Sequence, residues 1–198
     1  MWHFWRAEPT DPASVLVFVA GGLCFFVALI AVRLRRAPAG VGDRHSMRSM
    51  LGVGVQCVAI SLVGGPIEAH GSMVPLANAP RTLAVAVGMA AAVVLFAWSA
   101  YALGRNWAIV ARTRARHELV TGGPFAWVRN PIYVAMAFFM LSMALATGHT
   151  RQLIPASPLF VIGTLIRTTE EERLLRAHFG RAYDEYAARV KRFVPWVV

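Results

Sequence analysis

Long apolar runs separated by short polar connections divide the sequence. The first run, 13–32, holds about twenty residues without a charge, enough for an α-helix to cross the ~30 Å hydrocarbon core of a membrane. Four further runs follow, at residues 49–65, 82–103, 132–147 and 153–166. The pattern predicts an all-α, polytopic membrane protein with about five transmembrane helices.

Basic residues gather in alternate connections between these runs. They crowd 33–48, 105–129 and the tail 167–192, and few lie in the opposite loops. Because positively charged loops stay in the cytoplasm, this predicts a multi-pass protein with its N-terminus outside and its C-terminus inside. Glu8 and Asp11 precede the first run and arginines follow it, the reverse of a cleavable signal peptide, so we expect a retained anchor.

The tail is too charged to cross a membrane, but its apolar residues recur every three to four positions. Between 168 and 193 this spacing predicts a C-terminal amphipathic cytoplasmic helix lying on the bundle, stopped by Pro195. Phe193 and Trp196 are of the type that anchors a chain at the lipid headgroups.

Composition supports a membrane protein and excludes several other classes. The 198 residues are 57% hydrophobic and 15% charged, which is unlike a soluble domain or a disordered chain. The net charge of +10 follows the predicted membrane side, so we expect membrane lipids and not nucleic acid as partners. The six histidines are scattered and no Cys or His pair has metal-ligand spacing, so no metal site is expected.

Two stretches carry more polar chemistry than a plain helical bundle needs. Residues 105–133 contain the His117-Glu118 pair, followed by a Gly-Gly-Pro turn whose backbone amides can face a ligand. The second stretch is the acidic run 170–172. Both lie on the predicted cytoplasmic side.

Five pieces of sequence connect these stretches: Asn106-Trp107, His117-x-Leu119-Val120-Thr121-x-Gly123-Pro124-Phe125, Arg129-x-Pro131-x-Tyr133, Glu171-Glu172-x-x-Leu175 and Phe179-Gly180-x-x-Tyr183-x-x-Tyr186. In this order and spacing they resemble the integral-membrane methyltransferases of the isoprenylcysteine carboxyl methyltransferase and phospholipid methyltransferase type, which use S-adenosylmethionine. The resemblance covers roughly 106–196. It divides the chain into an N-terminal three-helix transmembrane part, 1–104, and a methyltransferase core, 105–198.

The resemblance implies an S-adenosylmethionine pocket on the cytoplasmic side, with a lipophilic or lipidated acceptor entering from the bilayer. The loop, the start of the fourth run and the beginning of the tail helix would form it. Arg129 and Glu172 are the expected catalytic residues. The expected cofactor-binding residues are His117, Leu119, Val120, Thr121, Gly123, Pro124, Phe125, Asn130, Pro131, Tyr133 and Glu171.

These residue types suit a cofactor that carries a sulfonium, an ammonium and a carboxylate. Glu171, Glu172 and Tyr133 offer acceptors and an aromatic face to the cations. The Arg129 guanidinium can hold an anion bidentately, either the acceptor's carboxylate or the cofactor's. Methyl transfer needs alignment and exclusion of water, and no covalent nucleophile.

Simpler explanations of the same residues stay open. Thr168 and Thr169 each precede a glutamate by three residues, the spacing of a helix capping box. His117 alone would be an interfacial histidine, and Arg129 could extend its charge to the membrane surface. Members of the family often have His where this chain has Asn130, and amide chemistry cannot replace a titrating group.

Three acceptors remain open, with the carboxylate of an isoprenylcysteine-like substrate as the leading one. The alternatives are the amine of a phospholipid headgroup and a small thiol. From another class, the chain could be a non-catalytic membrane scaffold or a transporter subunit, but the predicted spans lack the charged residues of an ion pathway. Oligomeric state has no signal in the sequence.

Overall fold

The computed structural model describes residues 7–35, 46–65, 79–104 and 119–196. This part of the chain contains α1 (Pro12–Arg35), α2 (Met47–Val63), α3 (Ala79–Leu103), the short 3-10 helix η3 (Gly123–Ala126), α4 (Pro131–Thr147), α5 (Leu153–Phe179) and α6 (Arg181–Arg189). The described residues include no strand, and Val128 and Lys191 form an isolated bridge. The predicted all-α class is therefore confirmed.

Two helices are long and apolar enough to cross a membrane, over Pro12–Leu34 and Ala79–Leu103. α1 exposes large apolar side chains along its length, including Leu16, Leu23 and Val27, which a soluble protein would not leave to water. α2 and α4 are apolar but shorter, at 17 residues each. The chain thus has the character of a membrane protein.

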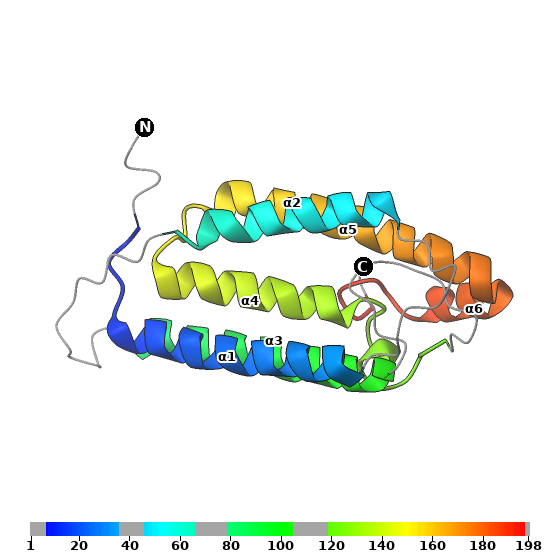
Figure 1. Cartoon of the computed structure of the whole chain (residues 1–198), viewed down its shortest axis with the longest axis horizontal. Helices are drawn as coiled ribbons and strands as arrows, with labels where there is room; N and C mark the ends of the chain where they lie inside the picture. The colour runs from blue at the N-terminus through cyan, green and yellow to red at the C-terminus, as the bar shows by residue number, and fades with distance from the viewer. Residues whose placement is uncertain (1–6, 36–45, 66–78, 105–118, 197–198) are drawn as a thin grey trace.

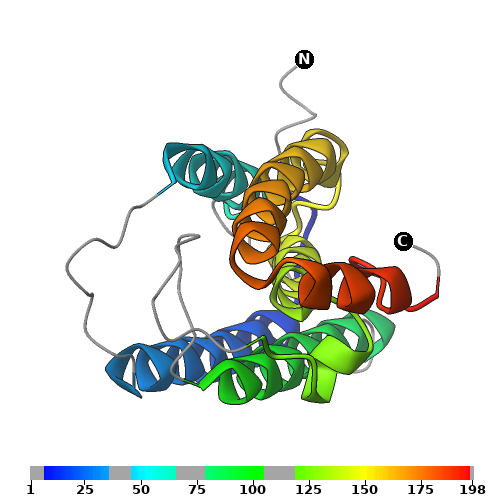
Figure 2. The same cartoon turned by 90° about the vertical axis from the view of Figure 1, so that its right-hand side faces the viewer.

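α4 lies between two pairs of helices, α1 with α3 and α2 with α5 (Figure 1; Figure 2). The helices α1 to α5 alternate in direction, so that α1, α3 and α5 end where α2 and α4 begin (Figure 1). Apolar clusters fill the two interfaces of α4, with Phe96, Ala100 and Ala135 on the α3 side. Met140 and Phe160 belong to the cluster that joins α4 to α2 and α5.

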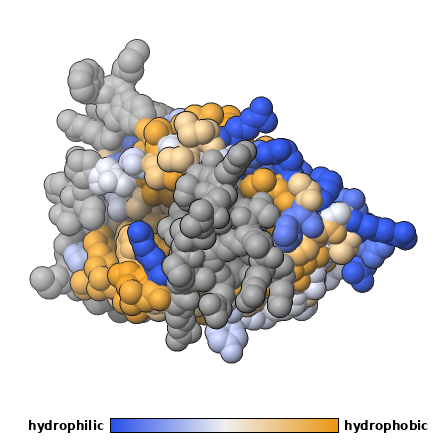
Figure 3. All heavy atoms as spheres, turned by 45° about the vertical axis from the view of Figure 1, so that its right-hand side comes forward, coloured by the Kyte–Doolittle hydropathy of each residue, from blue (hydrophilic) through white to orange (hydrophobic). Residues whose placement is uncertain are grey.

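The surface reflects this division into an apolar bundle and a charged end. Figure 3 shows hydrophilic residues gathered mainly at the end that carries α6, whereas apolar residues dominate the rest of the described surface in that view. The charged end is also where η3 and the start of α4 lie (Figure 1). The candidate site residues therefore belong to one end of the bundle.

The structure corrects the prediction for the tail. Instead of a span ending at 166 and a separate amphipathic helix over 168–193, α5 runs unbroken from Leu153 to Phe179. The helix continues because Arg167 and Thr168 are buried against the bundle and are not exposed at its end. Gly180, with a φ of 52°, then turns the chain into α6, which ends six residues before Pro195.

The same continuity overturns the capping-box explanation of the glutamates. Thr168 and Thr169 lie inside α5 and do not begin a helix. Their backbone amides are already hydrogen-bonded within the helix, so Glu171 and Glu172 have no capping role to fill. Another reason is needed for two carboxylates on this helix.

Candidate active site

The loop before α4 is held by one glycine and one tyrosine. Gly123 has a φ of 62°, a conformation that a residue with a Cβ rarely adopts, and a Cβ there would lie 3.2 Å from Nε1 of Trp98. Pro124 and Phe125 follow in η3, both buried. The hydroxyl of Tyr186 on α6 donates to the carbonyl of Phe125 at 2.7 Å. The loop is thereby fixed between α3 and α6.

The next residues pair with the C-terminal segment of the chain. The amide of Arg129 donates to the carbonyl of Lys191 at 2.8 Å, and the amide of Asn130 to that of Arg192 at 3.1 Å. The Asn130 side chain donates to the same Arg192 carbonyl at 3.3 Å. Asn130 then leads into Pro131, the first residue of α4. Asn130 therefore connects the start of α4 to the C-terminal segment through both its backbone amide and its side chain.

Glu172 is the centre of one polar cluster. It is 5% exposed and accepts hydrogen bonds from Nε and Nη2 of Arg192 at 2.9 and 2.8 Å. Nη2 of Arg129 lies 3.5 Å from the same carboxylate. Burial raises the pKa of Tyr183 to about 12, and the Glu172 charge acts in the same direction. Tyr183 therefore stays protonated beside this cluster.

Arg129 keeps donor capacity beyond this ion pair. It also hydrogen-bonds the side chain of Tyr183. Its buried Nε has no hydrogen-bond partner among the residues that the structure describes. Since an unpaired buried donor of a charged group is costly, Arg129 is suited to hold an additional acceptor such as a carboxylate.

Glu171 anchors a second cluster on the neighbouring face of α5. The Tyr133 hydroxyl donates to its Oε1 at 2.6 Å, and Nη2 of Arg167 lies 3.8 Å from the same oxygen. The guanidinium of Arg167 also sits over the Tyr133 ring, 4.9 Å from its centroid. Burial raises the pKa of the Glu171 carboxyl, although the Arg167 charge and the Tyr133 hydroxyl lower it.

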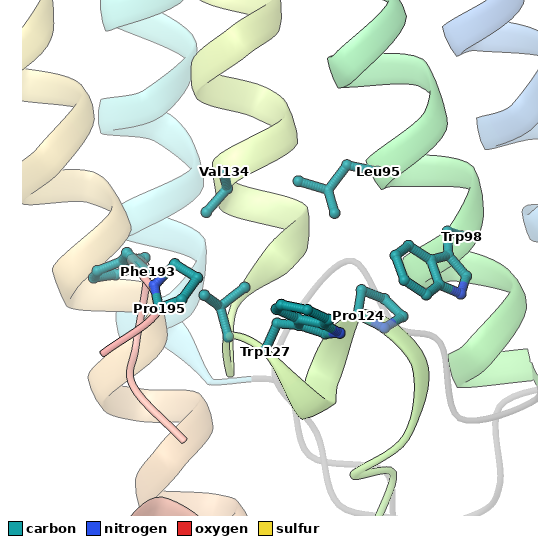
Figure 4. Close-up of a pocket in the computed structure, with 8 residues that line it drawn as sticks. Leu95, Trp98, Pro124, Trp127, Val134, Phe193 and Pro195 are labelled. Carbon is teal, nitrogen blue, oxygen red and sulfur yellow. The ribbon is translucent and has the colours of Figure 1, made fainter. Parts of the chain in front are cut away.

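An apolar groove of about 360 Å³ lies between α3, the loop, α4 and the C-terminal segment (Figure 4). Side chains from α3, the loop, α4 and the C-terminal segment surround it: Leu95, Trp98, Pro124, Trp127, Val128, Val134, Phe193 and Pro195. Val128 lines the groove, and the next residue, Arg129, contacts Glu172. An apolar surface and a cationic group thus meet within one short segment.

The structure places the predicted site residues in different surroundings, with Asn130 at the start of α4 as described above. His117 lies outside the described residues. The structure brings Arg129 together with Glu172, and Tyr133 with Glu171, while Pro124, Phe125 and Pro131 pack as buried scaffold. Leu119 and Val120 are half-buried at the start of the loop, and Thr121 and Gly123 are exposed.

Sequence reasoning missed three residues of these clusters. Arg167 and Arg192 were counted only among the basic residues of the tail, and Tyr183 only as an apolar position and a motif residue. Arg192 lies 20 residues from Glu172, whereas Arg167 precedes Glu171 by only four. A buried glutamate is expected to pair with an arginine, which could have pointed to these residues. The tail contains many arginines, however, and the sequence does not distinguish among them.

A model of the phospholipid methyltransferase family matches residues 81–182, just over half of the chain. The chain belongs to this family. A protein-S-isoprenylcysteine O-methyltransferase of Schizosaccharomyces pombe is 32% identical over 90 residues, which cover 45% of this chain. The matched region spans 38% of that relative's length. The family resemblance drawn from the motifs is confirmed, and the matched range contains both glutamates together with Arg129, Tyr133 and Arg167.

Proposed function

We propose that the chain is an S-adenosylmethionine-dependent methyltransferase of the membrane, acting on a lipophilic acceptor. The observation that carries this is the apolar groove bordered by Val128, next to the Arg129–Glu172 cluster. An acceptor with a lipid tail and a polar reacting end requires such a junction, because its two ends prefer different surroundings. Family membership supports the reaction class.

We further propose five membrane crossings, with the N-terminus outside and the site on the cytoplasmic side. The alternating directions of α1 to α5 support this arrangement (Figure 1). Arg33 and Arg35 lie in the last turn of α1 and Arg48 in the first turn of α2, and these two helix ends lie at the end of the bundle that carries the glutamate clusters. That end is the cytoplasmic one by the positive-inside rule.

The residues present fit the cofactor. The orphaned Nε of Arg129 provides a buried donor for a carboxylate, and Glu171 with Tyr133 provides an acceptor and an aromatic face for a cation. The side chain of Glu171 is 27% exposed, so a ligand can reach it. S-adenosylmethionine, when bound, supplies an electrophilic methyl group on its sulfonium. The protein's part is to orient both reactants and exclude water.

A carboxylate acceptor, as in an isoprenylcysteine-like substrate, suits this site best. A carboxylate is ionised at neutral pH and needs no base, whereas an ammonium or thiol must lose a proton. The Asn130 amide is engaged with Arg192, and Tyr183 is held protonated. Glu172 is paired with two arginines. The described residues beside the groove thus offer no ready proton acceptor.

Calorimetric binding of S-adenosylhomocysteine to detergent-purified protein tests the cofactor. We expect micromolar binding by the wild type that is lost in Arg129→Ala and Glu172→Ala, with Arg181→Ala as control because that arginine lies on the exposed face of α6. Absence of binding by folded wild type would overturn the proposal and favour a scaffold.

Labelled S-adenosylmethionine then tests the acceptor. Farnesylcysteine, phosphatidylethanolamine and a hydrophobic thiol are offered separately to protein in lipid nanodiscs. We expect base-labile methyl ester from farnesylcysteine. Methylation of the phospholipid amine instead would fit the family's name and would reject the carboxylate reading.

A further inference from the structure

A buried polar chain leads from the middle of α2 to the Tyr133–Glu171 cluster. Gln56, 1% exposed, donates through Nε2 to the Thr164 hydroxyl at 2.7 Å. Its Oε1 accepts from Nη1 of Arg167 at 2.8 Å. Arg167 in turn covers the Tyr133 ring and pairs with Glu171. The side-chain amide of Gln56 on α2 therefore hydrogen-bonds α5 through both its nitrogen and its oxygen.

Two glycines make room for these side chains. A Cβ at Gly52 of α2 would lie 2.5 Å from Cγ of Arg167, and one at Gly163 of α5 would lie 2.8 Å from Cγ of Gln56. Each helix thus omits a side chain where the other helix inserts a polar one. The close approach of α2 and α5 is built around Gln56 and Arg167.

This arrangement gives Arg167 a fixed direction. An arginine side chain has several rotatable bonds and loses entropy when it is held in place. The Gln56 oxygen holds one nitrogen of the guanidinium, and the stem packs over Gly52. The remaining face is then presented to Tyr133 and Glu171. Gln56 lies outside the family match at 81–182, so nothing in that match assigns it a role.

We propose that Gln56 is a positioning residue, which sets the affinity for S-adenosylmethionine by keeping Arg167 over the Tyr133 ring and no closer to the Glu171 carboxylate than 3.8 Å. This rests on the proposed function of the site. Without the Gln56 acceptor, the Arg167 guanidinium would rotate or move closer to Glu171 and neutralise it. Glu171 and the Tyr133 ring would then bind the cofactor's cationic part less strongly.

Three variants separate positioning from simple packing. Gln56→Met removes the acceptor for Arg167 at similar volume. Gln56→Glu keeps an acceptor there. Thr164→Val removes only the partner of Gln56 Nε2 and leaves the contact with Arg167. We expect S-adenosylhomocysteine affinity to fall about tenfold in Gln56→Met, the effect of one hydrogen bond to a charged group, and to change less than threefold in the other two.

A second readout needs no cofactor. In full-length protein carrying 3-fluorotyrosine at position 133, the ¹⁹F resonance reports the cation above the ring. We expect it to move in Gln56→Met and to stay near the wild-type position in Gln56→Glu and Thr164→Val. An unmoved resonance in Gln56→Met would overturn the positioning role, as would equal affinity losses in Gln56→Met and Thr164→Val. If the resonance moves as expected but wild type binds no cofactor, the proposed function fails while Gln56 still positions Arg167.

Discussion

Arg192 closes a bidentate contact on Glu172, and its carbonyl accepts from both the amide and the side chain of Asn130. One residue of the C-terminal segment thus ties the start of α4 to α5. Arg192 lies beyond the region that matches the family, 81–182. The C-terminal segment is therefore part of the candidate site.

A double-mutant cycle between Arg192→Met and Glu172→Gln measures this contact. We expect a coupling of about 1 kcal/mol in the free energy of unfolding in detergent, because the hydrogen bonds are charged and short but Arg192 is 36% exposed, where water screens it. Arg181 and Glu185, an exposed pair on α6, serve as the control and should show no measurable coupling. Equal coupling in the two cycles would mean that the Arg192 contact is an ordinary surface pair.

Arg129→Lys tests whether the guanidinium geometry matters. Lysine keeps the charge but cannot contact Glu172, Tyr183 and a carboxylate ligand with a planar fork of donors. We expect kcat/KM for methyl transfer to fall at least about tenfold, with thermal stability nearly unchanged. Arg189→Lys, on the exposed side of α6, is the matched control. Full activity in Arg129→Lys would remove the anion-binding role.

The pKa of Glu171 predicts how ligand binding depends on pH. Burial raises this pKa above the ordinary 4.5, and the ammonium group of S-adenosylhomocysteine is attracted by the ionised form of the carboxyl. Affinity for S-adenosylhomocysteine should therefore fall as pH is lowered, beginning above pH 4.5. The stability contribution of this carboxyl has the opposite sign, since it is present below the ordinary pKa and lost as pH rises through the folded one.

Glu171→Gln supplies the control for that pH dependence. The amide can still accept from Tyr133 but does not titrate. Its affinity should be weaker and flat over the same pH range, as measured by calorimetry in matched buffers. If the wild-type affinity were equally independent of pH, the cationic group of the ligand would not bind at Glu171.

Much of the helical framework is readable from the sequence because apolar runs fix it locally. The run 132–147 became α4, Pro131–Thr147, and 82–103 became α3, Ala79–Leu103, each within three residues at either end. The end of α5 was not readable. Residue 166 closes the apolar run, but helix continuation depends on Arg167, whose partner Gln56 lies 111 residues earlier.

The candidate site was predictable as a set of residues and not as a geometry. Motif spacing placed Arg129, Tyr133, Glu171 and Glu172 in one region, and the structure brings them together in two pairs. Which cation meets which carboxylate depends on the turn at Gly180, which returns the chain so that Arg192 reaches Glu172. The direction of the chain after α5 depends on the positive φ of Gly180, and the spacing of apolar residues in the sequence does not predict that turn.

Asp11 caps the start of α1 and should contribute measurably to stability. Its Oδ1 accepts from the Ser14 amide at 2.8 Å. Burial raises its pKa, but hydrogen bonds from Ser14 and Thr82 outweigh this and lower it below the ordinary value. We expect Asp11→Ala to lose about 1 kcal/mol of unfolding free energy at neutral pH and Asp11→Asn to lose less. The difference between wild type and Asp11→Asn should vanish as pH falls below 3.8, because the stability of a lowered carboxyl is lost on protonation.

Gly52 and Gly54 lie on the same helix and offer a matched test of the α2–α5 interface. A Cβ at Gly52 would meet the Arg167 stem and, at 2.8 Å, the carbonyl of Gly163, whereas a Cβ at Gly54 meets nothing within 4 Å. Both substitutions to alanine gain the same helix propensity of about 1 kcal/mol. We therefore expect Gly54→Ala to be neutral or stabilising, and Gly52→Ala to lower the melting temperature and weaken S-adenosylhomocysteine binding together. If Gly52→Ala bound the ligand like Gly54→Ala, the space beside Arg167 would not matter to the site.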